Sequence, residues 1–189
     1  MKWRNSWSVL YVEDDPNDVL LLQRAFRLEE IHNPLNVAVD GAEGIAWLSG
    51  HGQFANRARY PLPDLVILDI KMPKINGLVV LKWIRAHPGL KGLPVIVLTS
   101  SYLPEDVAAA HQLGANAFIV KPCLYEELRE VVRFLKYWML HTSPPPTDER
   151  DWIALKLSDL EQRWPESALH TVSSSPGQTA PQQQGADAA

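Results

Sequence analysis

The sequence predicts an α/β fold in which strands and helices alternate along the chain and the strands form one parallel sheet. Short apolar runs occur at residues 8–12, 65–68, 95–98 and 117–120. They are apolar almost without interruption, which is typical of parallel strands buried on both faces. Segments whose apolar residues recur at helical spacing follow these runs. With a weaker strand after the first helix, the expected order is (βα)5, with helices on both faces of the sheet.

Local signals place the first two helices. Pro16 is well placed at a helix start, and apolar residues continue at helical spacing to about Glu30. A short β-like segment at residues 35–39 then leads through the turn Asp40-Gly41 into a short helix over residues 42–48.

Residues 49–63 connect this helix to the next strand. A connection of this kind usually has about 2 to 6 residues, so we interpret the segment as an insertion. Its basic residues, Arg57 and Arg59, either contact a partner or belong to a solvated loop.

The second half of the chain repeats the strand and helix pattern. The helix after the strand at 65–68 ends at the His87-Pro88-Gly89 break. The next helix opens at Pro104-Glu105-Asp106, whose carboxylates suit the positive end of the helix dipole, and closes at Leu113-Gly114. The last helix is expected over residues 125–140.

The last helix has more large apolar residues than one narrow face needs. We assign to the core a stripe formed by Leu128, Val131, Leu135 and Trp138. Aromatic residues and Met are enriched at contacts between chains. We therefore predict a homodimer interface formed by Phe134, Tyr137, Trp138 and Met139. The alternative is that these residues pack against the chain's own C-terminal segment.

The 189 residues divide into one domain and an extension. Residues 6–141 form the predicted domain. Residues 142–164 form a Pro-rich linker and a possible amphipathic helix. Residues 165–189 are rich in Ser, Gln, Ala, Pro and Gly and are expected to be disordered.

Bulk properties exclude several classes of function. The formal net charge is −4 and no helix is rich in Lys and Arg, so nucleic-acid binding is not expected. Cys123 is the only cysteine, which excludes an intrachain disulfide, and we interpret it as a small structural residue. No signal-peptide pattern or membrane-length apolar run is present, so we expect a cytoplasmic protein without membrane contact.

Acidic residues close two of the predicted strands. Glu13 and Asp14 follow the first strand, and Asp69 follows the strand at 65–68. In open α/β sheets, ligands bind at the carboxyl ends of the strands. Grouped carboxylates repel one another and favour a bound cation, and oxygen ligands suit Mg²⁺. The sequence therefore predicts a magnesium site at this edge.

Two further polar groups reach the same edge, because Thr99 ends one strand and Lys121 ends another. A hydroxyl and an ammonium beside a carboxylate and a metal form a cradle for a phosphoryl group. This combination predicts phosphoryl transfer to Asp69.

At these residues the chain resembles the receiver domain of two-component response regulators. The matching segments are Tyr11 to Asp15, Val66 to Gly77, Val97 to Ser100 and Val120 to Pro122. The resemblance implies a flavodoxin-like fold and phosphorylation of Asp69 by a partner histidine kinase. It also implies that Asp14 binds Mg²⁺ directly, Glu13 through water, and Lys71 through its backbone carbonyl. Thr99 and Lys121 would contact the phosphoryl group, and Phe118 would be an aromatic switch.

A narrower resemblance links the chain to receivers that serve phytochrome-type histidine kinases. It rests on the insertion, the Glu13-Asp14 pair and the aromatic end of the last helix. Departures from the commonest receiver pattern are Glu13 in place of Asp, Asn76 in place of an acid, and Lys71 two residues after Asp69. These changes bear on rates rather than on identity.

Other interpretations remain open. An aspartate-based phosphatase or phosphotransferase also forms an aspartyl phosphate, although it generally needs a second acid where Lys71 stands. A flavodoxin-like cofactor binder would need a phosphate-binding loop after the first strand, and the sequence lacks one. Phe118 could be an ordinary buried strand residue, and Lys121-Pro122 is a candidate cis peptide or an ordinary turn.

Overall fold

The structure is a computed structural model that describes residues 7–141 of the chain. The predicted linker and amphipathic helix (142–164) and the predicted disordered tail (165–189) lie outside the described residues. Eleven elements follow one another: β1 (Val9–Val12), α1 (Pro16–Leu28), β2 (Leu35–Ala38), α2 (Gly41–Ser49), a 3-10 helix (Gly52–Ala55), β3 (Leu65–Leu68), α3 (Gly77–Ala86), β4 (Val95–Thr99), α4 (Pro104–Gln112), β5 (Ala117–Val120) and α5 (Tyr125–His141).

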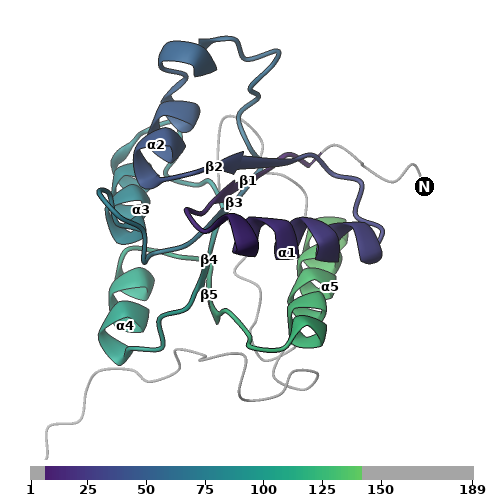
Figure 1. The fold of residues 1–189 in the computed structure, drawn as a ribbon. Helices are drawn as coiled ribbons and strands as arrows, with labels where there is room; N and C mark the ends of the chain where they lie inside the picture. The colour runs from purple at the N-terminus through teal and green to yellow at the C-terminus, as the bar shows by residue number, and fades with distance from the viewer. Residues whose placement is uncertain (1–6, 142–189) are drawn as a thin grey trace, which may run out of the picture.

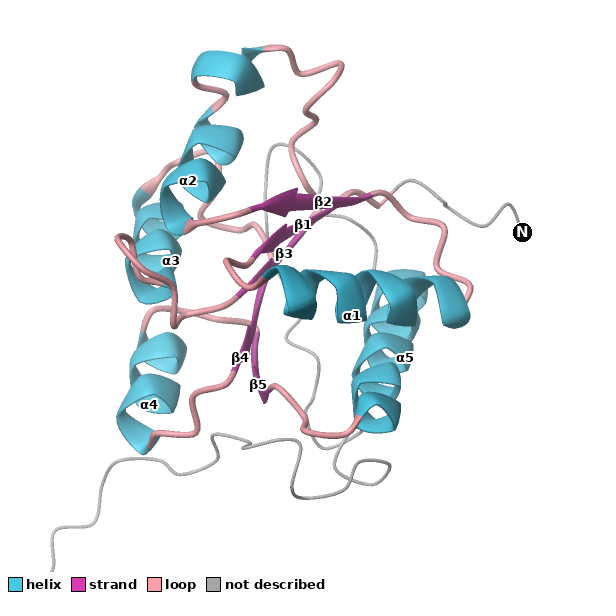
Figure 2. Cartoon of the chain, viewed as in Figure 1, coloured by secondary structure: helices cyan, strands magenta, loops and turns pink. Residues whose placement is uncertain are grey.

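The five strands form one parallel sheet in the order β2-β1-β3-β4-β5 (Figures 1 and 2). Helices α1 and α5 cover one face, and α2, α3 and α4 cover the other. Every residue of β1, β3 and β4 is buried, which explains their continuous apolar sequences. The predicted (βα)5 fold is confirmed.

Side chains that accept backbone hydrogen bonds start the helices on the site edge of the sheet. Asp15 accepts the N–H of Asn17 at 2.8 Å and begins α1, and Asn76 accepts the N–H of Leu78 at 2.7 Å and begins α3. Gly77 follows Asn76 because a Cβ atom there would lie 2.1 Å from the backbone oxygen of Asp69. The departure at Asn76 therefore has a structural role as a helix cap.

The insertion between α2 and β3 is folded around aromatic rings. The ring of Phe54 lies 5.0 Å from that of Trp47 and 5.1 Å from that of Tyr60. Arg57 donates to the carbonyl oxygens of Trp47 at 2.6 Å and Leu48 at 2.8 Å, near the end of α2. Arg57 is an exposed loop residue whose guanidinium also caps α2, and a partner contact by Arg57 or Arg59 stays a prediction.

The predicted core stripe of α5 is buried, Trp138 included, whereas the predicted interface position is wrong for Phe134 and Met139. Phe134, Trp138 and Met139 are buried in the same core as Trp7, whose ring meets that of Trp138 edge-on at 5.3 Å. The buried stripe of α5 is wider than a four-residue stripe because α5 packs along α1 as well as against the sheet. Tyr137 alone among the four is exposed, at 51%.

Candidate functional site

Carboxylates from two adjacent strands meet at the carboxyl edge of the sheet. β1 and β3 pair in register, and the N–H of Asp69 donates to the backbone oxygen of Val12 at 3.0 Å. This pairing brings Asp69 beside Glu13, the first residue after β1. One oxygen each from Glu13, Asp14 and Asp69 lie within 4.8 Å of one another. Glu13 and Asp69 are buried and Asp14 is exposed, so the group opens to solvent on one side.

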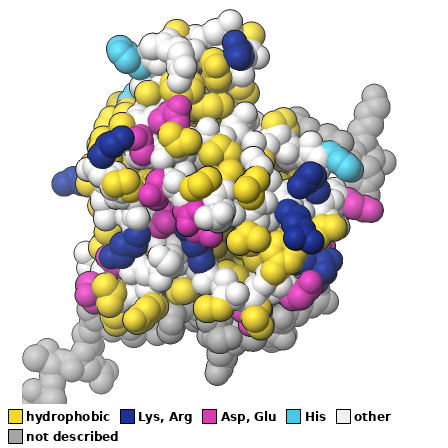
Figure 3. All heavy atoms as spheres, in the orientation of Figure 1, with side chains coloured by type: hydrophobic (Ala, Val, Ile, Leu, Met, Phe, Trp, Pro, Cys, Tyr) yellow, Lys and Arg dark blue, Asp and Glu magenta, His cyan; other side chains and the backbone are white. Residues whose placement is uncertain are grey.

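This carboxylate group fits a divalent cation. Three negative charges so close together repel one another, and a doubly charged ion with oxygen ligands relieves the repulsion. Figure 3 shows acidic side chains gathered beside the start of α1, next to dark blue Lys and Arg side chains. Because Asp14 is exposed, an ion held by these residues would be accessible to water or to phosphoryl oxygens.

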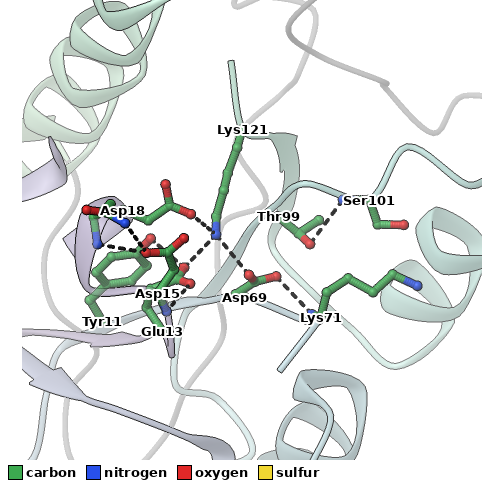
Figure 4. A network of polar contacts seen from close by, with 10 residues as sticks. Tyr11, Glu13, Asp15, Asp18, Asp69, Lys71, Thr99, Ser101 and Lys121 are labelled. Carbon is green, nitrogen blue, oxygen red and sulfur yellow. Dashed lines mark hydrogen bonds and ion pairs between the residues drawn. The ribbon is translucent and has the colours of Figure 1, made fainter. Parts of the chain in front are cut away.

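The ammonium of Lys121 lies at the centre of the polar network (Figure 4). It donates to Glu13 at 2.7 Å, to Asp18 at 2.7 Å and to Asp69 at 2.8 Å. Burial alone would lower the pKa of Lys121, but the hydrogen bonds to these three carboxylates outweigh burial and raise the pKa. Lys121 therefore stays charged and holds together groups from α1, β1 and β3.

Glu13 is fixed by its neighbours on both oxygens. Its Oε2 accepts the hydroxyl of Tyr11 at 2.7 Å as well as Lys121, and its Oε1 accepts the N–H of Asp15 at 3.1 Å. Burial raises the pKa of Glu13, while the hydrogen bonds from Lys121 and Tyr11 oppose that rise. Burial and the nearby charge of Glu13 raise the pKa of Tyr11. Tyr11 is thus a neutral donor that orients the Glu13 carboxylate.

The loop after β3 orients the other buried acid. The N–H of Lys71 donates to Asp69 Oδ1 at 2.9 Å, which leaves Oδ2 for Lys121. This contact places the backbone of Lys71 beside the carboxylate group, as the predicted ligand role of its carbonyl requires. The side chain of Lys71 turns to α4, where its amine pairs with Asp106 at 2.5 Å.

Thr99 lies in β4 and Phe118 in β5, the two strands on one side of β3. Thr99 is buried at the end of β4, and its hydroxyl accepts the N–H of Ser101 at 3.3 Å. Phe118 in β5 is 7% exposed and packs in the core under α2, α3 and α4. It pairs in register with Val97, two residues before Thr99. Phe118 is therefore a buried strand residue, and its switch role stays a prediction.

Of the two alternatives for Lys121-Pro122, the cis peptide is contradicted, because residues 7–141 contain no cis peptide, and the ordinary trans proline stands. The N–H of Lys121 donates to the backbone oxygen of Thr99 at 2.7 Å, which extends the β4–β5 pairing up to Pro122.

Sequence reasoning missed Asp18 as a member of the site. An acid in the first turn of a helix is usually assigned to the helix dipole, and this assignment hides the contact with Lys121. The signal that could have found Asp18 is its place one turn after Glu13-Asp14, at the start of a helix that begins at the same edge.

The fold and this edge of the sheet define the class of protein. A family model described as the response regulator receiver domain matches residues 9–133. The chain therefore belongs to the response regulator receiver family, as the motifs predict.

Similar proteins with known names place the chain more narrowly within the receiver family. The response regulator Rcp1 of Synechocystis sp. (strain ATCC 27184 / PCC 6803 / Kazusa) is 33% identical over 138 residues, which cover 73% of this chain and 92% of Rcp1. The crystal structure of its Mn²⁺-bound form matches with a TM-score of 0.68, over 74% of this chain and 99% of that one. The phosphorylated cyanobacterial phytochrome response regulator RcpA is 30% identical, with a TM-score of 0.66 over 73% of this chain and 97% of its own.

A third relative is a response regulator in red light signaling of R. palustris. It is 32% identical, with a TM-score of 0.70 over 75% of this chain and 99% of its own. The chain is thus a receiver domain of a two-component response regulator, homologous to phytochrome response regulators. Its carboxylate cluster and the Mn²⁺-bound relative indicate a divalent metal, and family membership implies a histidine kinase as partner.

No helix within residues 7–141 combines the length and the apolar character that crossing a membrane requires.

Proposed function

We propose that Asp69 accepts the phosphoryl group from a histidine kinase, with Mg²⁺ held by Glu13, Asp14, Asp69 and the backbone carbonyl of Lys71. The supporting observation is the convergence at Asp69. Its buried carboxylate shares a metal-sized group with Glu13 and Asp14 and lies 2.8 Å from the ammonium of Lys121.

The chain's own residues prepare the acceptor. In the reaction, an oxygen of Asp69 bonds to phosphorus while the bond from phosphorus to the kinase's histidine nitrogen breaks, and that nitrogen keeps the electron pair. The Lys71 N–H and the Lys121 ammonium each hold one carboxylate oxygen and so orient the nucleophile. Mg²⁺, when bound, offsets negative charge on the transferred oxygens.

Thr99 and Lys121 contact the phosphoryl group in this proposal. Thr99 ends β4, the neighbour of β3, and Lys121 follows β5, the neighbour of β4, so both lie on the β4 side of Asp69 at the same edge of the sheet. A movement of Thr99 toward the phosphoryl group would open space near Phe118, which packs beneath the same strand ends. Phe118 would then report phosphorylation to the α4 side of the sheet.

The phosphatase or phosphotransferase alternative receives less support. Its second acid would be expected two residues after the nucleophile, where Lys71 stands. The amine of Lys71 pairs with Asp106 instead of facing the carboxylate group. A signalling phosphoacceptor, whose output is a changed protein contact, is the better assignment.

A phytochrome-type histidine kinase is the proposed phosphoryl donor. The similarity to Rcp1, to RcpA and to the R. palustris regulator supports this choice. The proposal places the protein in the cytoplasm, where the catalytic parts of such kinases act, and includes a homodimer of receivers. These statements concern the pathway and are independent of the assignment of Asp69.

The experiment is phosphorylation with acetyl phosphate, followed by intact-mass measurement. We expect one phosphoryl group per chain with Mg²⁺, none after chelation of the metal, and none in Asp69→Asn. Asp15→Asn is the matched control, because Asp15 is an exposed neighbouring acid and Asn caps a helix equally well. Stoichiometric labelling of Asp69→Asn at another residue would contradict the assignment. Incubation with phosphorylated phytochrome-type kinases then tests the donor separately.

A further inference from the structure

The ammonium of Lys121 has three N–H donors, and each reaches a different carboxylate. Two of the acceptors, Glu13 and Asp69, belong to the metal-binding group, while the third, Asp18, does not. Asp18 is contributed by a helix, and Figure 4 shows its carboxylate on the opposite side of Lys121 from Asp69. The resting site thus uses every donor of Lys121, one of them on a residue without a role in the proposed function.

The position of Asp18 is set by rigid structure. It lies in the first turn of α1, which begins at Asp15 and Pro16 and is anchored in the core by Leu22 and Phe26. The Asp18 oxygen is 2.7 Å from the nitrogen of Lys121, as short as the contact with buried Glu13. A distance of this size is typical of a charge-assisted hydrogen bond. The helix dipole would favour an acid in this turn, but it would not direct its side chain onto Lys121.

The full use of its three donors limits how Lys121 can contact a phosphorylated Asp69. A phosphoryl group on Asp69 brings three strong acceptor oxygens. Because Lys121 has no spare N–H, it can contact the phosphoryl group only by giving up a bond that it makes in the resting state. Asp18 competes for the ammonium from the α1 side, and its charge also repels an anionic phosphoryl group. Both effects favour the resting arrangement.

We propose that Asp18 is a positioning residue that retains Lys121 on the α1 side of the site and so opposes its transfer to a phosphoryl group on Asp69. The inference rests on the proposed function of Asp69 and Lys121. It adds a residue that sets how readily this receiver switches. A receiver with a neutral side chain at this position should adopt the phosphorylated arrangement more easily.

The first test is titration with beryllofluoride, a phosphoryl mimic, in the presence of Mg²⁺, followed by NMR of the backbone amides. Asp18→Asn should lower the half-saturating concentration on the order of fivefold, the size expected for one partly exposed ion pair. Asp18→Glu, which keeps the carboxylate, should stay closer to the parent. Asp15→Asn removes an equal charge nearby without touching Lys121, so it should shift the midpoint much less.

The second test needs neither metal nor phosphoryl mimic. Urea unfolding of the metal-free parent, Asp18→Asn, Lys121→Gln and the double variant forms a mutant cycle. In the Lys121→Gln background, Asp18→Asn only relieves repulsion among the carboxylates, whereas in the parent it also breaks the ion pair with Lys121. If Asp18 acts through Lys121, Asp18→Asn should therefore raise the unfolding midpoint more in the Lys121→Gln background than in the parent. A helix-dipole role predicts the same shift in both backgrounds.

The outcomes separate the two proposals. A parent that takes up no beryllofluoride at Asp69 would contradict the proposed function itself. A parent that responds, with Asp18→Asn behaving like the parent or like Asp15→Asn, would overturn the role of Asp18 and leave the function intact. Additive effects in the mutant cycle would also overturn it.

Discussion

The amine of Lys71 lies 2.5 Å from a carboxylate oxygen of Asp106 and joins the loop after the proposed phosphoacceptor to the first turn of α4. The hydroxyl of Ser101 donates to the same carboxylate oxygen. Lys71 first, and Ser101 second, lower the pKa of Asp106 below its ordinary value of 3.8. Lys71, which departs from the commonest receiver pattern, therefore holds the first turn of α4 to the loop after β3.

This pairing predicts a defined pH dependence of stability. Because the pKa of Asp106 is lower in the folded state, its ionised form contributes stability above pH 3.8, and that contribution is lost as the pH falls through the lower, folded pKa. Asp106→Asn should lower the free energy of unfolding at pH 7 by less than about 1 kcal/mol, since Lys71 is partly exposed. The difference should be constant between pH 7 and 5 and shrink below about pH 4.

Urea unfolding of the parent and Asp106→Asn at several pH values makes this measurement. Glu105→Gln, which removes an exposed acid from the same turn of α4, is the control for the loss of one charge. A difference between parent and Asp106→Asn that stays unchanged below pH 3.5 would show that Asp106 is not stabilised as a carboxylate.

Asp14→Ala is predicted to stabilise the metal-free protein and to weaken the response to Mg²⁺. Removal of one of three carboxylates that lie within 4.8 Å of one another relieves repulsion. A gain of about 1 kcal/mol corresponds to a rise of roughly 4 °C in Tm for a domain of this size. Thermal melts with and without Mg²⁺ test both effects. An undiminished metal-dependent shift in Asp14→Ala would show that Asp14 is not a ligand.

Lys121→Ala is predicted to separate labelling from switching. Asp69 keeps its contact with the Lys71 N–H, so acetyl phosphate should still label it, at a rate lowered on the order of tenfold or more. The amide shifts around Phe118 and α4 that accompany labelling of the parent should be absent. NMR of the labelled proteins makes the comparison, and parent-like shifts in Lys121→Ala would count against its coupling role.

The main features of the site could be predicted from the sequence because strand ends are visible in it. Glu13, Asp14, Asp69, Thr99 and Lys121 each end an apolar run, and parallel strands bring all such ends to one edge. The lysine contacts of Asp18 and Asp106 are harder to predict, for a different reason. Each residue lies in the first turn of a helix, where an acid already has a local explanation, and the contact with a lysine depends on how the helix packs on the sheet.

The fold was predictable to the same extent. The strands follow from hydrophobic runs, whereas the width of the buried face of α5 depends on two neighbours, the sheet and α1. A stripe assigned from one helix alone leaves out Phe134 and Met139. Likewise, Arg57 caps α2 from ten residues away, and its partners are backbone carbonyls that every sequence provides.

Arg57→Ala is predicted to loosen the insertion and the end of α2. The two charge-assisted hydrogen bonds to the carbonyls of Trp47 and Leu48 would be lost at the negative end of the helix, which should cost about 1–2 kcal/mol. Arg59→Ala, which removes a cation 5.3 Å above the ring of Tyr60, should cost less than about 1 kcal/mol. Limited proteolysis between residues 50 and 63 should be faster in Arg57→Ala. Equal cleavage rates in the two variants would contradict the capping role.

The homodimer stays a prediction, and of its two aromatic residues Phe134 and Tyr137 only Tyr137 is exposed for such a contact. Phe134→Ala should destabilise the fold by about 3–5 kcal/mol through loss of buried area and a cavity. Tyr137→Ala should leave the unfolding midpoint almost unchanged while weakening a dimer formed through α5.

Sedimentation of the parent and Tyr137→Ala, each with and without beryllofluoride and Mg²⁺, tests the association. If phosphorylation reaches α5 through β5, dimer affinity should change by a coupling of roughly 1–3 kcal/mol. A parent that stays monomeric in both states would contradict the homodimer and leave Tyr137 as a contact for a different partner.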